Sequence, residues 1–312
     1  MRARLAFAAA LSLAGLASPA LADKDPPPAP TLAIEEKNLV SGKYKIDPAQ
    51  GYIFLRTDGR SNGAFVRIPD EQDLADYTAV FERSFAKAVK TYESQAAGYE
   101  KAVTFAQQRN LIVPLKPVKP ERETFSVGDI GQRTLVNVGP MYAFSKNAAT
   151  DEYSYLQLVK PGTYIYYGPV FVAANGVGSG VCFCMGSVRF EVKAGQITDL
   201  GDFLTVAPDQ TAQVPSDMDP KLVSRLHGPG TPRYGLPASL AAYPSAKAEF
   251  HASGKLNNFY GLTVSRMQPV PGVLAYQRDV AIDVVSGERV VLGFPRPMPG
   301  AAAAPNSGGG QP

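Results

Sequence analysis

The stretch YSYLQLV-KPG-TYIYY, residues 153–167, is the part of this chain that decides its fold class. Aromatic and β-branched residues fill Tyr153–Val159 and Thr163–Tyr167, and the turn-forming Lys160-Pro161-Gly162 separates the two runs. Short runs of this kind, bounded by proline and glycine, predict β-strands. We therefore expect a protein built mainly from antiparallel β-strands.

Runs of the same kind lie on both sides of this stretch. Upstream, Tyr52–Arg56 and Ala64–Ile68 flank the turn residues Asp58-Gly59 and predict a β-hairpin. Closely spaced strands with Gly and Pro turns are typical of a sandwich or a barrel, and we expect an antiparallel β-sandwich. Further strands are predicted at Thr134–Phe144, Val181–Val192, Ile197–Leu204, Lys247–Ala252, Phe259–Met267, Val273–Gln277, Val280–Val285 and Arg289–Leu292.

One segment has a helical pattern instead. Asp70, followed by Asp73, suits a helix N-cap, and apolar or small residues recur every three or four positions from Leu74 to Ala106. The pattern predicts a long α-helical insertion in the sandwich over about residues 70–109. At 1.5 Å per residue such a helix is roughly 60 Å long.

A proline-rich segment follows the helix and extends the insertion to residues 70–125. Pro114, Pro117 and Pro120 recur every third residue, which is typical of an extended polyproline conformation that returns along the helix. The helix either packs across the sheet, which is the commoner arrangement, or projects as an arm that pairs with a partner. We expect the apolar residues of the returning segment to face the helix: Leu111, Ile112, Val113, Leu115 and Val118.

The first 22 residues have the features of a secretory signal peptide. Arg2 and Arg4 precede the apolar stretch Leu5–Ala17, and Ala20-Leu21-Ala22 fits a signal-peptidase site. The apolar stretch is shorter than the ~20 residues that span a bilayer. We expect cleavage after Ala22 and a periplasmic or secreted protein with no integral membrane span.

The remaining chain divides into segments of different composition. Residues 23–33 and 295–312 are rich in proline or in glycine and alanine and can bury little, so we expect a disordered tether and a disordered tail. Between them we expect the sandwich with its insertion over 34–206 and an irregular linker over 207–245, with a short helix at Asp219–Leu226. Additional strands over 246–294 belong to the same domain or to a small second one.

Charge and cysteine content exclude several classes of protein. Loss of the leader, which contains Arg2 and Arg4 and no acid, lowers the net charge from +3 to +1. A nearly neutral chain without a dense basic cluster is not expected to bind nucleic acid. The two cysteines are too few for a disulfide scaffold.

Cys182-Phe183-Cys184 is the most suggestive motif for chemistry. On a regular strand the two cysteines point to the same side, with Cα atoms roughly 6–7 Å apart, near the upper limit for a disulfide. A structural disulfide or a role in the core is the expected one. A redox pair, or a Cu(I) site that includes Met185, is the alternative. We expect no resident metal or cofactor.

Three tyrosines of the opening stretch, Tyr164, Tyr166 and Tyr167, are a candidate binding face. Aromatic side chains of this kind bind sugars or peptides where they are exposed, and they are equally common in a core. Both interpretations stay open at this stage.

The remaining candidate residues have weaker patterns, and we expect no catalytic residue among them. His227 and His251 are too few for a zinc signature, and His251 is expected to be exposed on a strand. Asp279 and Asp283 have the spacing of an acid pair on one strand face, although solvated carboxylates are commoner. Gly176–Gly180 fits neither a nucleophile elbow nor a dinucleotide-binding loop, so we expect a turn.

Part of the chain resembles uncharacterised bacterial envelope proteins with β-sandwich domains. The matching residues are Lys160–Tyr164, Phe190–Gly195 and Leu200-Gly201. In those proteins a P-G-x-Y turn enters one strand and an F-x-V-x-A-G…L-G pair of strands follows. The resemblance covers about Tyr153–Leu204, implies a β-sandwich and brings no catalytic residues.

These observations favour an exported, soluble, non-enzymatic envelope protein that acts through contacts with another envelope protein or a glycan. A redox or copper-handling periplasmic protein that uses Cys182 and Cys184 is the alternative. A hydrolase of unrecognised type is the third hypothesis. The sequence leaves the ligand and the oligomeric state open.

Overall fold

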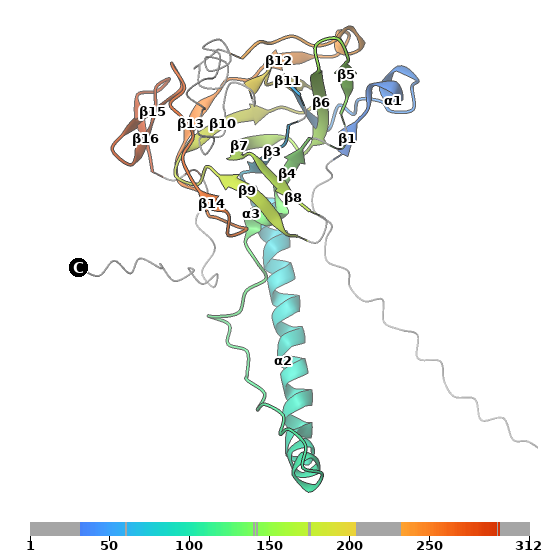
Figure 1. The fold of residues 1–312 in the computed structure, drawn as a ribbon, viewed down its shortest axis with the longest axis vertical. Helices are drawn as coiled ribbons and strands as arrows, with labels where there is room; N and C mark the ends of the chain where they lie inside the picture. Colours follow the sequence, from blue (N-terminus) through green and yellow to red (C-terminus); the bar gives the residue numbers. More distant parts are fainter. Residues whose placement is uncertain are drawn as a thin grey trace, which may run out of the picture.

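The computed structural model describes residues 32–59, 61–139, 141, 143–173, 176–203, 232–291 and 293. Within them, strand residues outnumber helical residues and most strand pairs are antiparallel, so the prediction of a mainly β protein with one long helix is confirmed (Figure 1). Residues 1–31, the helix expected at Asp219–Leu226, His227 and the expected tail lie outside the described residues.

The first large sheet has the strand order β1-β6-β2-β11-β12, and β5 also pairs with β6. β2 and β6 are antiparallel along their whole lengths, whereas β11 is parallel to both β2 and β12. The short helix α1 (Glu36–Val40) follows β1. The strands are β1 (Leu32–Ile34), β2 (Gly51–Asp58), β5 (Ser145–Asn147), β6 (Glu152–Val159), β11 (Ile197–Asp199) and β12 (Ser245–Lys247).

The second large sheet has the order β13-β10-β7-β3-β4 and is antiparallel throughout. Its strands are β3 (Gly63–Arg67), β4 (Leu135–Val138), β7 (Gly162–Gly168), β10 (Ser187–Val192) and β13 (His251–Ser253). Because β2 and β3 belong to different sheets, the hairpin predicted over Tyr52–Ile68 is wrong. The alternating pattern identifies each run as a strand but does not specify the strand with which it pairs.

Two three-stranded sheets complete the strand body. One has the order β14-β9-β8, and the other the order β15-β16-β17. The run Val181–Val192, predicted as one strand, contains the end of β9 and the whole of β10, which belong to different sheets. The bounds are β8 (Val170–Val172), β9 (Gly178–Cys182), β14 (Thr263–Val264), β15 (Leu274–Gln277), β16 (Val280–Asp283) and β17 (Glu288–Val290), with α3 (Ile130–Arg133) and the 3-10 helix η1 (Ala238–Leu240) between strands.

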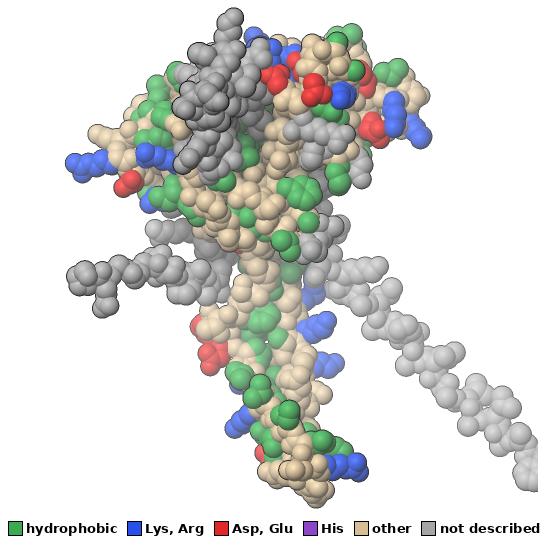
Figure 2. Space-filling view, viewed as in Figure 1, with side chains coloured by type: hydrophobic (Ala, Val, Ile, Leu, Met, Phe, Trp, Pro, Cys, Tyr) green, Lys and Arg blue, Asp and Glu red, His purple; other side chains and the backbone are tan. Residues whose placement is uncertain are grey.

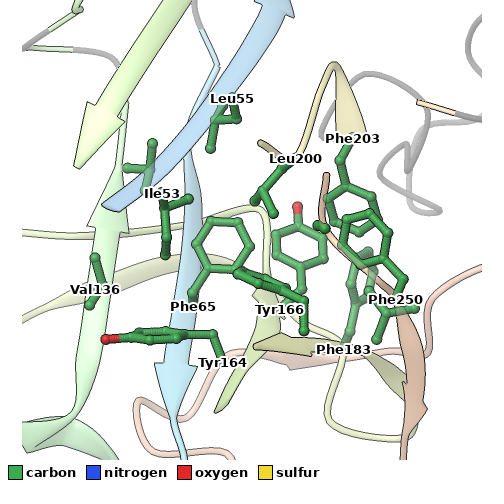
Figure 3. Close-up of a cluster of buried hydrophobic side chains, with 14 of the residues drawn as sticks. Ile53, Leu55, Phe65, Val136, Tyr164, Tyr166, Phe183, Leu200, Phe203 and Phe250 are labelled. Atoms are coloured by element: carbon green, nitrogen blue, oxygen red, sulfur yellow. The ribbon is translucent and has the colours of Figure 1, made fainter. Parts of the chain in front are cut away.

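The main core cluster contains side chains from both large sheets (Figure 3). Ile53 and Leu55 come from β2, and Phe65 comes from β3. The ring of Phe65 has its centroid 5.4 Å from that of Tyr166 and 5.5 Å from that of Phe190. Aromatic contacts at these separations stabilise the cluster beyond simple burial.

The three tyrosines of β7 are core residues. Tyr164, Tyr166 and Tyr167 are each at most 1% exposed. Alternation along the strand directs Tyr164 and Tyr166 into the main cluster and Tyr167 into a second cluster on the opposite face. The interpretation of these residues as an exposed binding face is therefore wrong, because both faces of β7 are covered.

The long helix α2 (Glu71–Gln108) projects away from the strand body, and residues 109–129 return beside it (Figure 1). We call α2 and this returning segment the arm. The helix predicted over 70–109 is confirmed, whereas the expected packing across a sheet is wrong. Its length is about 57 Å at 1.5 Å per residue. In the part of the chain that the structure describes, no helix has both the length and the apolar character needed to cross a membrane.

Candidate functional site

The arm is fixed to the strand body by a buried ion pair at the start of α2. Arg67 is 2% exposed, and its guanidinium lies 2.7 and 2.8 Å from the two carboxylate oxygens of Asp73. Lys160 Nζ lies 2.6 Å from the carboxylate of Asp70. These contacts join the first turn of α2 to the end of β3 and to the turn between β6 and β7.

The same two aspartates form the N-terminal cap of α2. The backbone N–H of Asp73 donates to Asp70 Oδ1 at 2.9 Å, and the N–H of Asp70 donates to Asp73 Oδ2 at 2.9 Å. Burial alone raises the pKa of the Asp73 carboxyl, but the hydrogen bonds from Arg67 and Asp70 and the Arg67 charge hold this pKa well below its ordinary value. Asp73 therefore stays ionised and fixes Arg67.

A second attachment holds the returning segment at the same end of the arm. The hydroxyl of Tyr77 donates to the carbonyl of Gly128 at 2.7 Å, and Asn257 Nδ2 donates to Asp129 Oδ2 at 2.9 Å. Because both ends of the insertion are attached to the body, the arm leaves it in a defined direction.

An aromatic cluster holds the two parts of the arm together further out. The ring of Phe125 lies edge-on to Phe81 and Phe85, with centroids 5.6 and 5.4 Å apart. Arg122 forms an ion pair with Glu82, and its guanidinium lies 5.2 Å from the centroid of Phe81. The returning segment is thus pinned to α2 rather than loose.

Beyond this cluster, apolar side chains of the returning segment point into solvent. Ile112, Leu115 and Val118 are 95, 94 and 86% exposed. In an extended chain with three residues per turn, residues three apart share a face, and here the half-buried Pro117 and Pro120 take the inward positions. The prediction that five apolar residues, including Leu111 and Val113, face the helix is therefore wrong. We call Ile112, Leu115 and Val118 the apolar row.

Charge is distributed unevenly along the arm. The distal residues 87–119 contain six lysines and arginines and two glutamates. The proximal residues, 70–86 and 120–129, contain two arginines and eight acids. Figure 2 shows basic and apolar side chains together on the distal part of the arm. The apolar row therefore lies in a basic region at the far end of an acidic support.

The cysteines form a buried disulfide. Cys182 and Cys184 are bonded, with Cα atoms 5.1 Å apart, and they are 0 and 3% exposed. The assumption that Cys182–Cys184 is one regular strand is wrong, since β9 ends at Cys182 and the chain turns before β10. This turn brings the two Cα atoms closer than a strand does. Neither sulfur is accessible to a redox partner or a metal carrier without a change in the surrounding structure.

His251 and Asp283 meet, although they are far apart in sequence. His251 Nδ1 lies 3.0 Å from Asp283 Oδ2, and the hydroxyl of Ser286 donates to the same oxygen at 3.1 Å. Asp283 is 2% exposed, so the expectation of a solvated carboxylate is wrong for this residue. In a catalytic triad the serine binds the histidine, and the histidine binds the aspartate. Here the serine and the histidine both bind the aspartate, so these three residues do not have the arrangement of a triad.

Comparison with known proteins adds no assignment: no protein-family model, no curated protein and no solved structure matches this chain.

Among the described residues, no group of three or more His, Cys, Asp or Glu side chains is arranged to hold a metal ion. The exposed apolar row in its basic surroundings makes the arm the candidate functional site. Sequence reasoning missed its anchor, Arg67, because nothing in the pattern of β3 shows that a charged residue there is buried.

Proposed function

We propose that this chain is an exported, non-enzymatic envelope protein in which a β-sandwich body holds out a rigid arm for a protein partner. The observation that carries the proposal is the apolar row, Ile112, Leu115 and Val118, exposed on a segment that is held against α2 at Phe125 and Gly128. The signal-peptide pattern of residues 1–22 supports the export part.

The arrangement of the row distinguishes it from ordinary surface residues. Isolated exposed leucines are common, but three large apolar side chains on one face of a pre-extended segment form a continuous contact surface. Proline-rich extended segments dock into apolar grooves of their partners and lose little conformational entropy on binding. The row has this form before any partner is present.

Charge indicates the chemistry of the partner. Lys116 and Lys119 alternate with the row residues, so a groove with an acidic rim is complementary to it. A second copy of the chain offers acids along its proximal arm. However, the exposed positions at the start of that helix, such as Glu71 and Gln72, are polar and provide no apolar groove. We therefore favour a different protein as the partner.

Site-specific photo-crosslinking in intact cells of the native host tests this proposal. The photoreactive residue p-benzoylphenylalanine replaces Leu115 in the row or, as a matched control, the exposed Gln95 on α2. We expect an adduct of one defined mass from position 115 and none from position 95. Adding Ile112→Ser and Val118→Ser to the position-115 variant is expected to lower the yield at least tenfold.

Three results of this experiment contradict the proposal. An adduct with the mass of two copies shows self-association, and equal adducts from positions 95 and 115 show unspecific contact. Absence of any adduct removes the support for a partner. The row could also bind a membrane, and sedimentation of the purified protein with phosphatidylglycerol vesicles tests this. Vesicle binding that is lost when the row is replaced by serine identifies a membrane surface as the partner and contradicts the proposal.

A further inference from the structure

A cavity of about 610 Å³ lies in the strand body, beside β1, α1, β4, β6 and β8. Its volume is within the range of about 300–1,000 Å³ that is usual for ligand-binding sites. Phe171 and Met141 supply apolar surface, and Asn38, Asn137 and Gln157 supply side-chain amides. None of the residues of the arm lines it, so it is separate from the site proposed above.

Gln157 is the residue that needs an explanation. Along β6, Tyr153, Tyr155 and Val159 direct their side chains into the main core cluster, and alternation places Gln157 on this same face. The residue is 7% exposed, and its side-chain amide has no hydrogen-bond partner among the described residues. The amide is also not fully enclosed by protein atoms, so it borders the cavity. An amide that faces a cavity and has no protein partner is available to hydrogen-bond a ligand there.

Sheet edges meet at this cavity. In the part of the chain that the structure describes, β1, β4 and β8 are each the last strand of a sheet, and residues of all three line the cavity. An edge strand has backbone N–H and C=O groups without strand partners, and extended peptides bind proteins by pairing with such groups. Edges of three or four residues match an extended peptide of about 10–13 Å.

The lining also limits the charge of the ligand. No lysine, arginine or histidine is among the described residues that line the cavity. Its carboxylate, Glu35, is exposed and forms an ion pair with Lys37, with 2.6 Å between Lys37 Nζ and the carboxylate. An amide side chain has one acceptor and two donors, which match the N–H and C=O of a peptide group. We propose that this cavity binds a short, uncharged, extended peptide segment whose backbone pairs with Gln157 and with a neighbouring strand edge.

Nuclear magnetic resonance of the ¹⁵N-labelled full chain tests the proposal. The probe is N-acetyl-L-alanine N′-methylamide, which contains two peptide groups and no charge. We expect its addition to produce saturable shifts of the Gln157 side-chain amide signal, which the Gln157→Leu variant identifies by its absence. Methyl β-D-glucopyranoside and inorganic phosphate, at the same concentrations, are expected to produce none.

Matched variants separate binding from folding. Gln157→Leu is expected to remove the probe-induced shifts of the remaining cavity signals, while the urea midpoint does not fall because the amide has no protein partner to lose. Ser154→Ala is the control on the same strand, since the Ser154 hydroxyl is hydrogen-bonded to that of Ser145 at 2.7 Å and does not line the cavity. It is expected to keep the shifts.

Each other outcome overturns the inference. Shifts with the glucoside alone identify a sugar site, and shifts with phosphate alone identify an anion site. Absence of saturable shifts with any probe means that the cavity is not a binding site for peptide groups. A lower urea midpoint for Gln157→Leu shows that the amide is already satisfied in the free protein. If that variant does not fold, Phe171→Ala replaces it, because Phe171 is 38% exposed at the cavity and its loss is expected to weaken the shifts.

Discussion

Arg67 occupies a strand position whose neighbours Phe65 and Val66 are apolar and fully buried. A buried guanidinium is tolerated only when its charge is compensated, and here the carboxylate of Asp73 binds it with two contacts. Asp73 belongs to the first turn of α2, so satisfying one buried charge also determines where the arm begins. This pair is therefore the buried one among the contacts that position the arm.

The first prediction concerns this pair. Asp73→Asn leaves Arg67 buried without its main counter-charge, and we expect a loss of about 3 kcal/mol in the free energy of unfolding at pH 7. Urea denaturation of the full chain measures it. Asp76→Asn is the matched control in the same turn of α2, where the carboxylate accepts a hydrogen bond from the exposed Gln72, and is expected to change stability by less than about 0.5 kcal/mol.

The same pair predicts a pH dependence. Because the pKa of Asp73 is lower in the folded protein than its ordinary value near 4, its contribution to stability is fully present above about pH 4. It is lost as the pH falls toward the folded pKa. The difference in stability between the wild type and Asp73→Asn should therefore be constant from about pH 7 to pH 5 and decrease below about pH 4. A constant difference down to pH 2 would show that Asp73 is not held ionised.

The second prediction concerns Asp283. Burial alone raises the pKa of this carboxyl, but hydrogen bonds from His251, from the backbone of Ala252 and from Ser286 lower it overall. Asp283→Ala removes the common acceptor of these groups, and we expect a loss of about 2 kcal/mol in urea denaturation. Ser286→Ala removes one bond and leaves the rest, with an expected loss below about 1 kcal/mol. Equal losses for the two variants would contradict the central position of the carboxylate.

At the scale of elements, α2 illustrates how a helix is stable away from the body. Its stripe of apolar residues needs cover, which normally comes from a sheet or another helix. Here the chain supplies the cover itself, through Phe125 against Phe81 and Phe85 and through the prolines of the returning segment. The helix therefore does not need to lie on the strand body.

The third prediction tests this cover. Phe125→Ala removes two edge-on ring contacts, worth about 1–2 kcal/mol together, and should loosen the returning segment around it. We expect tryptic cleavage after Arg122, which is followed by Glu123 and not by proline, to become about tenfold faster, since 1.4 kcal/mol corresponds to a factor of ten. Ile112→Ala, at a position 95% exposed, should leave the cleavage rate unchanged. The urea midpoint of the strand body should be unaffected in both variants.

At the scale of the whole molecule, the chain combines a strand body with a support about 57 Å long whose far end is basic and apolar. Such a shape places a contact surface at a distance from the body. Which partners can reach this contact surface depends on the compartment of the protein. The signal-peptide pattern of residues 1–22 predicts that compartment.

The fourth prediction concerns that compartment. In the native host, we expect the protein in the periplasmic or secreted fraction, with Asp23 as its first residue after cleavage at Ala20-Leu21-Ala22. Amino-terminal sequencing or mass spectrometry of the purified protein measures this. Replacing Ala22 by Gln is expected to block cleavage, whereas Ser18→Gln lies outside the small-residue pair of the site and should not. An intact amino terminus in a cytosolic fraction would contradict export.

The sequence by itself determined the β-rich class, the position of the long helix and the return of the chain along it. These features follow from local periodicity, because residues close together in the sequence determine each of them. Only the tertiary structure decided which strands pair, that the arm projects, and that the row Ile112, Leu115 and Val118 faces outward while Tyr164, Tyr166 and Tyr167 are buried. The physical reason is that burial and pairing depend on neighbours distant in sequence, such as Asp73 beside Arg67 and Phe125 against Phe81, which no local pattern specifies.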